Sequence, residues 1–146
     1  MFDVIFDIDG TIADVEHRRH HVRGPGKKDW KAFNVGMVHD PVVDPVVSVL
    51  RALHNSGCTI ILCSGRGTEN RQKTIDWLSK HNIPYHALYM RAINDYRRDD
   101  VVKKELLDQI LDDGFKPIIA FDDRQQVVDM WRDNGMVCAQ VAPGDF

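Results

Sequence analysis

The sequence has 146 residues, a net charge of −3, 43% apolar residues and 28% charged residues. A chain of this length and composition is typical of one compact globular domain. Its negative net charge excludes a globally basic nucleic-acid-binding chain. No apolar run approaches the ~20 residues of a membrane span, and the first three residues lack the basic region of a secretory signal. We therefore expect a cytoplasmic protein without membrane contact. The three cysteines lie in or beside apolar runs and are expected to be buried and reduced: Cys58, Cys63 and Cys138.

Five short apolar runs alternate along the chain with amphipathic stretches. The runs are Phe2–Ile8, Thr59–Cys63, Tyr85–Met90, Pro117–Phe121 and Met136–Val141. Short runs that are apolar on both faces are typical of parallel strands buried between helices. Their alternation with helices predicts a three-layer α/β fold around a parallel five-stranded sheet.

Capping residues and apolar stripes predict four helices between these strands. Asp44 and Pro45 indicate the cap and first turn of one helix, which Gly57 ends, and Asp100 is expected to cap another that ends before Gly114. The remaining two helices are centred on residues 74–78 and 127–131.

Residues 13–43 fit neither pattern and are expected to form a flap or small cap insert within a single domain over residues 1–146. A short helix is possible around Trp30 and Phe33. Between His17 and Lys31 this segment holds six Lys or Arg residues, three His and one acid. The local basic excess predicts an exposed basic rim that either contacts phosphates or is simply solvated.

Asp7 and Asp9 lie in the motif Phe6-Asp7-Ile8-Asp9-Gly10-Thr11, at the end of the first apolar run. Two carboxylates two residues apart at a strand end face the same side. Such like charges are costly beside a buried strand unless a cation compensates them, and carboxylate oxygens suit Mg²⁺. The motif therefore predicts a magnesium site, whereas acids that merely cap a turn are the alternative.

Three further elements follow strands or begin helices at the same edge of the predicted sheet. Ser64 comes directly after the second run, Lys103 opens the third helix, and Asp122 and Asp123 close the fourth run. A hydroxyl and a lysine can hold phosphoryl oxygens, and the acids can complete a metal shell. Ligands of open α/β sheets bind beyond the carboxyl ends of the strands, so the four signals converge on one site.

The order Asp-x-Asp, Ser, Lys, Asp-Asp resembles the haloacid dehalogenase superfamily, which has a Rossmann-like core. The resemblance implies a Mg²⁺-dependent phosphatase in which Asp7 is the nucleophile and forms an aspartyl-phosphate. It also implies that Asp9 is the general acid and base. Ser64 and Lys103 would then hold the phosphoryl group. Asp7, the backbone of Asp9 and Asp122 would hold Mg²⁺, and Asp123 would support that metal shell.

The sequence further resembles the 3′-phosphatase domain of phage polynucleotide kinase over nearly its whole length. The shared segments are Arg23-Gly24-Pro25, Ser64-Gly65-Arg66, Asp99–Lys103, Asp122-Asp123-Arg124, Gln126-Val127-Val128, Met130-Trp131-Arg132 and Gly144-Asp145-Phe146. The resemblance implies a polynucleotide 3′-end as substrate. A free nucleotide or another small phosphomonoester is the alternative. No G-x-x-x-x-G-K-[ST] kinase loop occurs, so a separate kinase or ligase protein is a possible partner.

The same resemblance implies substrate contacts from Arg23, Gly65, Arg66 and Arg91. Lys27 and Lys28, together with Arg18, Arg19, Arg97 and Arg98, would extend these contacts into the basic rim.

Two other classes of protein use similar residues. A receiver-type signalling module also carries a phosphorylated Asp, a hydroxyl and a lysine, but its acidic pair follows the first strand, whereas here it follows the fourth. A zinc module built on His17, His20 and His21 lacks a fourth ligand at the usual spacing.

Overall fold

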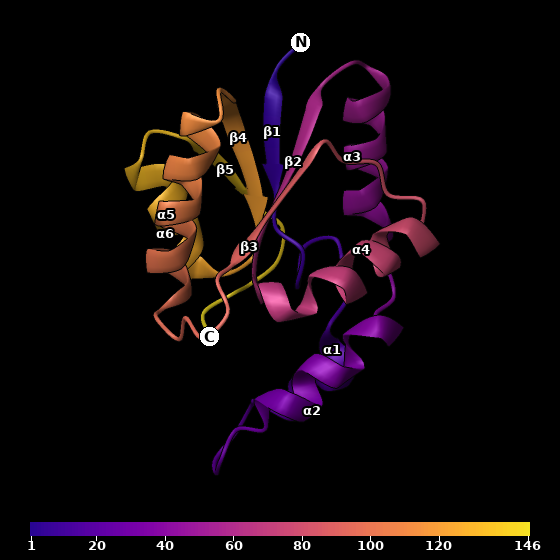
Figure 1. The fold of residues 1–146 in the computed structure, drawn as a ribbon, viewed down its shortest axis with the longest axis vertical. Helices are drawn as coiled ribbons and strands as arrows, with labels where there is room; N and C mark the ends of the chain where they lie inside the picture. Colours follow the sequence, from indigo (N-terminus) through magenta and orange to yellow (C-terminus); the bar gives the residue numbers. More distant parts are fainter.

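The computed structural model describes residues 1–146 and contains one five-stranded, fully parallel sheet in the order β3-β2-β1-β4-β5 (Figure 1). The strands are β1 (Asp3–Phe6), β2 (Thr59–Gly67), β3 (Ala87–Arg91), β4 (Pro117–Asp122) and β5 (Val137–Gln140). The helices are α1 (Glu16–Arg19), α2 (Trp30–Val35), α3 (Asp44–Asn55), α4 (Arg71–Lys80), α5 (Asp99–Asp112) and α6 (Gln125–Asp133). Short 3₁₀ turns span Gly36–His39 and Thr68–Asn70. The three-layer α/β fold expected from the sequence is thus confirmed.

Two apolar cores fill the spaces between the sheet and its helices. Successive strand side chains point to opposite faces, so Val4 and Phe6 join one core and Ile5 the other. The first core is completed by residues of α3 and α4, and the second by residues of α5 and α6. Figure 1 shows α3 and α4 on one side of the sheet and α5 and α6 on the other.

The chain reverses its direction across the sheet between β1 and β4. From β1 it steps outward to β2 and β3, then crosses back through α5 to place β4 on the other side of β1. Ligands of open α/β sheets bind at such a switch point, beyond the carboxyl ends of the strands. Here those ends are Phe6 and Asp122, and the backbone N–H of Asp7 still donates to Phe121 O at 2.9 Å.

Several element boundaries differ from those expected. β1 ends at Phe6 because the next residues leave the ladder and form a tight turn, in which Ile8 O accepts three backbone N–H groups. β2 runs past Ser64 to Gly67 after a register shift. Neither Asp44 nor Asp100 caps its helix, because both lie inside the first turn. Their negative charge there favours the helix through its dipole instead.

The segment between β1 and α3 forms the flap and contains α1, α2 and one 3₁₀ turn. An antiparallel bridge between Ala13 and Val42 closes its base, close to the 13–43 limits expected from the sequence. The side chain of Asp29 accepts a hydrogen bond from Ala32 N (3.0 Å) and caps α2. In Figure 1 the flap extends from the end of the sheet where the strands terminate.

All three cysteines are free and buried, as the sequence predicted. None of the helices is both long enough and apolar enough to cross a membrane.

Replacing Leu50 with Ala should lower the free energy of unfolding by about 2–5 kcal/mol, because the side chain is fully buried between α3 and the sheet. Val49 on the same helix is 42% exposed, so Val49→Ala should change stability by less than about 0.5 kcal/mol. Urea denaturation of the two variants measures the difference. Equal losses would mean that α3 does not anchor this core.

Candidate active site

Three buried carboxylates meet at the switch point of the sheet. Asp7 follows β1, Asp122 ends β4, and Asp123 comes directly after it. One carboxylate oxygen from each lies within 4.8 Å of the others, and all three side chains are buried. The sequence predicted this grouping because the carboxyl ends of neighbouring parallel strands share one edge.

The charges within this cluster are not balanced by the protein alone. Burial and the nearby Asp122 raise the pKa of Asp7 well above its ordinary value, although Lys103 opposes them. Burial and Asp122 likewise raise the pKa of Asp123 to about 6. In addition, Asp123 Oδ2 is buried without a hydrogen-bond partner. Arg19 Nη2 lies 3.6 Å from this oxygen, beyond hydrogen-bond distance, so Lys103 and Arg19 together leave the three buried acids with an excess of negative charge. Such a cluster fits a hard divalent cation, which would supply the missing positive charge.

Asp7 is oriented by two hydrogen bonds, one from a residue close to it in the sequence and one from a residue far from it. Thr11 Oγ1 donates to its Oδ2 at 2.9 Å, and Lys103 Nζ donates to its Oδ1 at 2.8 Å. Lys103 also reaches Asp122 Oδ2 at 3.0 Å. Burial alone would lower the pKa of Lys103, but Asp122 and Asp7 more than offset this and raise it. Lys103 is therefore charged and bridges two of the three carboxylates.

Asp122 and Asp123 are held in place by backbone and aromatic groups. Trp131 Nε1 donates to Asp122 Oδ2 at 3.1 Å, and the backbone N–H of Asp123 donates to Asp122 Oδ1 at 2.8 Å. Gly10 has φ +81°, and a side chain there would collide with the carboxylate of Asp123. Glycine in the Asp-x-Asp-Gly motif thus serves both the turn and the acidic cluster.

Asp9 lies apart from the three carboxylates and is bound by two arginines. Its Oδ1 accepts hydrogen bonds from Arg66 Nη2 (2.6 Å), Arg66 Nε (3.0 Å) and Arg18 Nη2 (2.9 Å). Burial pushes the pKa of Asp9 upward, but Arg66 and Arg18 outweigh it and keep the pKa below its usual value. The carboxylate of Asp9 is therefore aimed at the arginines, away from the acidic cluster.

Asp40, which is not among the residues predicted from the sequence, anchors both of these arginines. Its Oδ1 accepts from Arg18 Nε at 2.8 Å, and its Oδ2 accepts from Arg18 Nη2 at 2.7 Å and Arg66 Nη2 at 3.3 Å. Asp40 is 2% exposed, and its backbone oxygen accepts from Trp77 Nε1 at 2.8 Å. No sequence pattern marks Asp40, because only the fold buries it and brings it to Arg66.

Ser64 and Gly65 lie near the carboxyl end of β2, the strand that pairs with β1. Ser64 is buried, and its Oγ accepts a hydrogen bond from Arg66 N at 3.0 Å, which leaves the hydroxyl hydrogen free to donate. A side chain at position 65 would collide with the carboxylate of Asp99. The glycine therefore lets α5, which carries Lys103, approach β2 closely.

The exposed basic rim is smaller than the sequence predicted. Arg18 and Arg66 are buried and bound to Asp9 and Asp40, so neither belongs to an exposed surface. Arg91 directs four of its five N–H groups at Gly65 O, Asp95 O, Arg97 O and Asp99 Oδ1, and so holds the loop before α5. Three further rim arginines are paired with acids: Arg97 with Asp95 and Glu105, Arg98 with Asp100, and Arg19 with Glu16 and Asp123.

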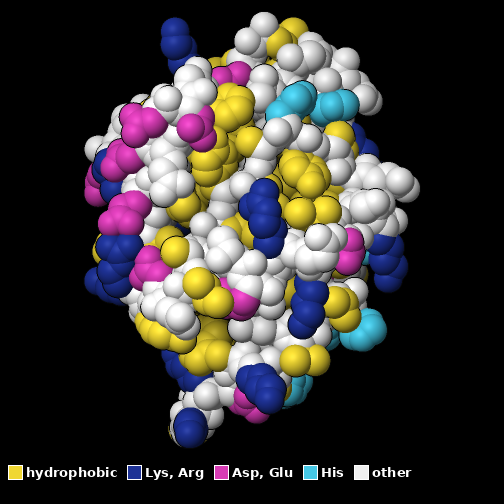
Figure 2. All heavy atoms as spheres, viewed as in Figure 1, with side chains coloured by type: hydrophobic (Ala, Val, Ile, Leu, Met, Phe, Trp, Pro, Cys, Tyr) yellow, Lys and Arg dark blue, Asp and Glu magenta, His cyan; other side chains and the backbone are white.

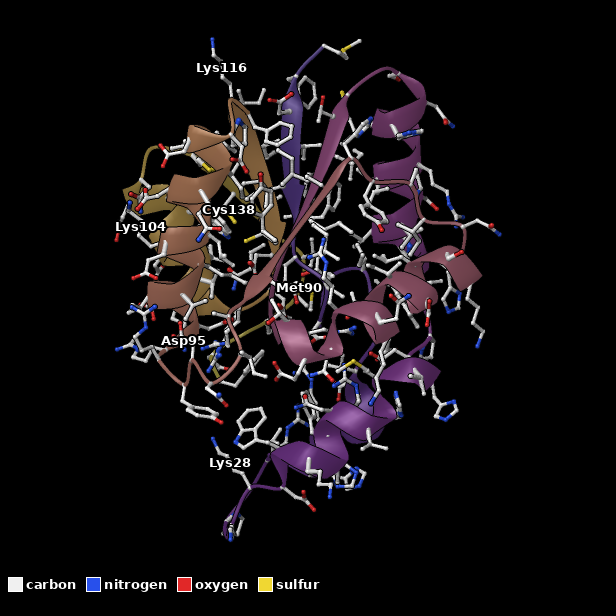
Figure 3. All side chains as sticks on the ribbon, in the orientation of Figure 1. Lys28, Met90, Asp95, Lys104, Lys116 and Cys138 are labelled. Carbon is white, nitrogen blue, oxygen red and sulfur yellow. The ribbon has the colours of Figure 1, made fainter.

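Arg23, Lys27 and Lys28 remain exposed on the flap. Arg23 has only a 3.8 Å ion pair, with Glu16. Figure 2 shows Lys and Arg side chains at the flap end of the molecule and also scattered over the rest of this face. In Figure 3, Lys28 lies on the flap, whereas Lys116 lies at the opposite end of the sheet. Of the expected rim residues, Arg23, Lys27 and Lys28 thus stay exposed on the flap, at the carboxyl-terminal end of the strands.

The three flap histidines do not converge on a common point that could hold a metal. His17 Nε2 lies 2.6 Å from Asp40 Oδ1, and the rings of His20 and His21 contact each other at a centroid distance of 3.9 Å. The group of metal-ligating side chains in this structure is instead Asp7, Asp122 and Asp123.

The fold and this site define a phosphatase of the haloacid dehalogenase type. A hydrolase of that class from Streptococcus pneumoniae has the same fold, with a TM-score of 0.68 and 13% identity over 96% of this chain and 84% of its own. The chain belongs more specifically to the family of polynucleotide kinase PNKP phosphatase domains, which matches residues 3–146.

Two relatives place this family in context. A chain from the Pnkp1/Rnl/Hen1 complex superposes with a TM-score of 0.85 and 36% identity, covering 100% of this chain and 47% of that one. A protein of Autographa californica nuclear polyhedrosis virus, assigned as a bifunctional polynucleotide kinase/RNA ligase, is 29% identical over 89% of this chain and 18% of its own length. The chain thus spans less than half the length of these two relatives.

When a chelator keeps the protein free of metal ions, the protein should become less stable as the pH rises from about 4 toward about 7. The pKa of Asp123 is about 6 in the folded state, against 3.8 ordinarily. Between these two pH values the folded state holds a proton on Asp123 that the unfolded state has lost, and this stabilises the fold. The stabilisation disappears once the pH exceeds about 6 and Asp123 ionises in the folded state too. Melting temperatures in EDTA should therefore fall by several degrees, and Asp123→Asn should flatten the change.

The exposed helical acid Asp133 provides the control, because Asp133→Asn should keep the wild-type pH dependence. A divalent cation should restore stability at neutral pH in wild type more than in Asp123→Asn. An unaltered pH dependence in Asp123→Asn would remove Asp123 from the unbalanced cluster.

Asp40→Asn should lower both stability and turnover, because two buried arginines lose half of their shared counter-charge. Removing one partner of a buried ion pair costs about 3–5 kcal/mol, and displacing Asp9 by about 1 Å can slow turnover roughly 10²-fold. His17→Ala removes only the half-exposed partner of the same carboxylate and should change turnover little. Wild-type turnover by folded Asp40→Asn would show that the arginines position Asp9 without it.

Proposed function

We propose that this domain is a Mg²⁺-dependent phosphomonoesterase that works through an aspartyl-phosphate on Asp7 and removes 3′-phosphates from polynucleotide ends. The observation that carries the chemistry is the environment of Asp7: a buried carboxylate, oriented by Thr11 and Lys103, within a cluster of acids that fits a divalent cation.

In the first step, an oxygen of Asp7 attacks phosphorus, and the bond to the leaving oxygen breaks. In the second step, water attacks the aspartyl-phosphate, releases inorganic phosphate and restores Asp7. Lys103 supplies positive charge next to the phosphoryl group in both steps, and the Ser64 hydroxyl is available to donate to a phosphoryl oxygen. Asp7, Asp122 and Asp123 would hold Mg²⁺, which neutralises phosphoryl charge when bound.

Asp9 would transfer the protons, giving one to the leaving oxygen and later taking one from the attacking water. Its lowered pKa keeps it ionised in the free protein and suits the second of these roles. An arriving phosphomonoester adds negative charge near Arg66 and Arg18, which raises the pKa of Asp9 and favours the first role.

The polynucleotide 3′-end is supported by membership in the PNKP phosphatase family and by the exposed basic residues of the flap, Arg23, Lys27 and Lys28. Lys and Arg side chains beside a phosphatase site can contact the phosphates next to the scissile one. A free nucleotide is the alternative substrate, and the number of rim arginines already paired with acids favours it. Its hydrolysis needs contacts to a single phosphate only.

A separate kinase or ligase would supply the remaining steps of end repair. Relatives are named for complexes or fusions of that kind, Pnkp1/Rnl/Hen1 and a polynucleotide kinase/RNA ligase. This chain spans less than half of each.

A panel of substrates tests the proposal. With Mg²⁺, a 3′-phosphorylated oligonucleotide should have a higher kcat/KM than a 5′-phosphorylated one or a nucleoside 3′-monophosphate. The advantage over the mononucleotide should shrink as salt rises, because each contacted phosphate of a single strand adds a slope of about −0.7 in log affinity against log salt. EDTA and Asp7→Asn should each abolish turnover.

Turnover in exhaustively chelated protein would exclude the metal, and turnover by Asp7→Asn would exclude the nucleophile. If substrate length and salt make no difference, the enzyme recognises a single phosphomonoester, and the nucleotidase alternative replaces the polynucleotide one.

A further inference from the structure

Trp30 is the one tryptophan of the chain that faces solvent. Its side chain, at the start of α2 on the flap, is 53% exposed, whereas Trp77 and Trp131 are 2% and 0% exposed and belong to the two cores. A half-exposed tryptophan does not contribute to either core, so its position on the flap calls for another explanation.

The indole of Trp30 begins a continuous line of side chains that ends at Asp9. Its ring meets that of Phe33 at 87° and a centroid distance of 5.6 Å. The guanidinium of Arg18 in turn lies 4.2 Å from the centre of the Phe33 ring, and Arg18 Nη2 donates to Asp9 Oδ1 at 2.9 Å. Phe33 is additionally fixed by its backbone oxygen, which accepts from Arg18 Nη1 at 3.1 Å. Trp30 is thus positioned relative to Asp9 through two intervening side chains.

The leaving group must lie on this side of the site. Under the proposed function, Asp9 gives its proton to the leaving oxygen, so the departing nucleoside lies next to Asp9 and extends outward along the flap. A perpendicular ring contact with Phe33 covers at most one face of the indole. Lys28 Nζ lies over the Trp30 ring, 5.7 Å from its centre, so an arriving base would displace this exposed, flexible side chain from the ring face.

We propose that Trp30 is a stacking platform for the base of the 3′-terminal nucleotide of a single-stranded nucleic acid, with Lys28 beside it to contact the adjoining phosphate. This inference rests on the proposed function and names the part of the substrate that the flap recognises. Stacking on an aromatic ring tolerates every base, because each has a π-face, so the enzyme would accept ends of any sequence. The flap would thereby distinguish a nucleotide end from other phosphomonoesters.

Abasic substrates provide the direct test. Two oligonucleotides with a 3′-phosphate are compared, identical except that one lacks the base of the terminal nucleotide. Wild type should prefer the base-bearing end by about 5- to 150-fold in kcat/KM, the range of one base–aromatic stack. Trp30→Ala should reduce this preference to near unity, and Trp30→Phe should retain much of it.

Val35→Ala is the matched control, because Val35 ends the same helix and is also exposed. It should keep the wild-type preference. The hydrolysis of the abasic oligonucleotide should be nearly equal in all four proteins, which separates a stacking defect from damage to the catalytic residues.

Binding can be observed independently of turnover by intrinsic fluorescence in the Asp7→Asn background. The 3′-phosphorylated oligonucleotide should quench the emission of exposed Trp30, the abasic one should quench it less, and Trp30→Phe should abolish the difference. Equal quenching by both oligonucleotides would overturn the inference.

The outcomes distinguish the inference from the proposal beneath it. If 3′-phosphorylated oligonucleotides are hydrolysed but Trp30→Ala keeps the full preference for a base, the inference is wrong and the proposed function stands. If small phosphomonoesters are hydrolysed and oligonucleotides are not, both are wrong.

Discussion

The structure depends on one buried electrostatic arrangement, the lysine-bridged carboxylates at the switch point of the sheet. Lys103 joins Asp7 to Asp122, and Asp123 completes an acidic group with more negative than positive charge. Isolated buried charges are costly, so the surrounding elements must hold these groups in fixed positions. Thr11, Trp131 and the glycines at positions 10 and 65 all serve that end.

A second charged group, built on the flap, complements the first. Arg18, Arg66 and Asp40 form a buried network around Asp9, in which Arg18 and Asp40 come from the flap and Arg66 comes from β2. The flap is therefore more than a cover, because Arg18 and Asp40 lie within it and determine where the carboxylate of Asp9 points. Two neighbouring acids of one short motif, Asp7 and Asp9, are thereby given opposite pKa shifts. A divalent cation at the three acids would lower the pKa of Asp7 again, because it compensates the negative charge of Asp122 and Asp123.

Much of this arrangement could be predicted from the sequence. The apolar runs, the helices and the Asp-x-Asp motif are local signals, and the rule that parallel strands share one carboxyl edge converts them into a site. Asp7, Ser64, Lys103, Asp122 and Asp123 were predicted in that way, and the structure places Lys103 against Asp7 and Asp122 with Asp123 close by.

Asp40 and Arg18 could not be found, because their roles depend on pairings across the tertiary structure. Arg18 and Arg66 looked like exposed rim residues, since a count of charges does not reveal which ones have buried partners. The prediction that Asp44 and Asp100 cap α3 and α5 was wrong for a related reason. An acid near the start of a helix can lie inside the first turn as readily as before it.

The crossover that places β4 beside β1 also has a consequence for how the domain folds. The ion pair between Lys103 and Asp7 joins residues 96 positions apart, and Asp122 comes later still. Contacts of such long range form slowly, because a large loop must close first. During synthesis, Asp7 emerges long before Lys103 and Asp122, and the face of the sheet that holds Ile5 stays uncovered until α5 and α6 follow. Chemical competence is thus acquired only when α5 and β4 dock, so a truncated or half-folded chain has no assembled site with which to attack a phosphate.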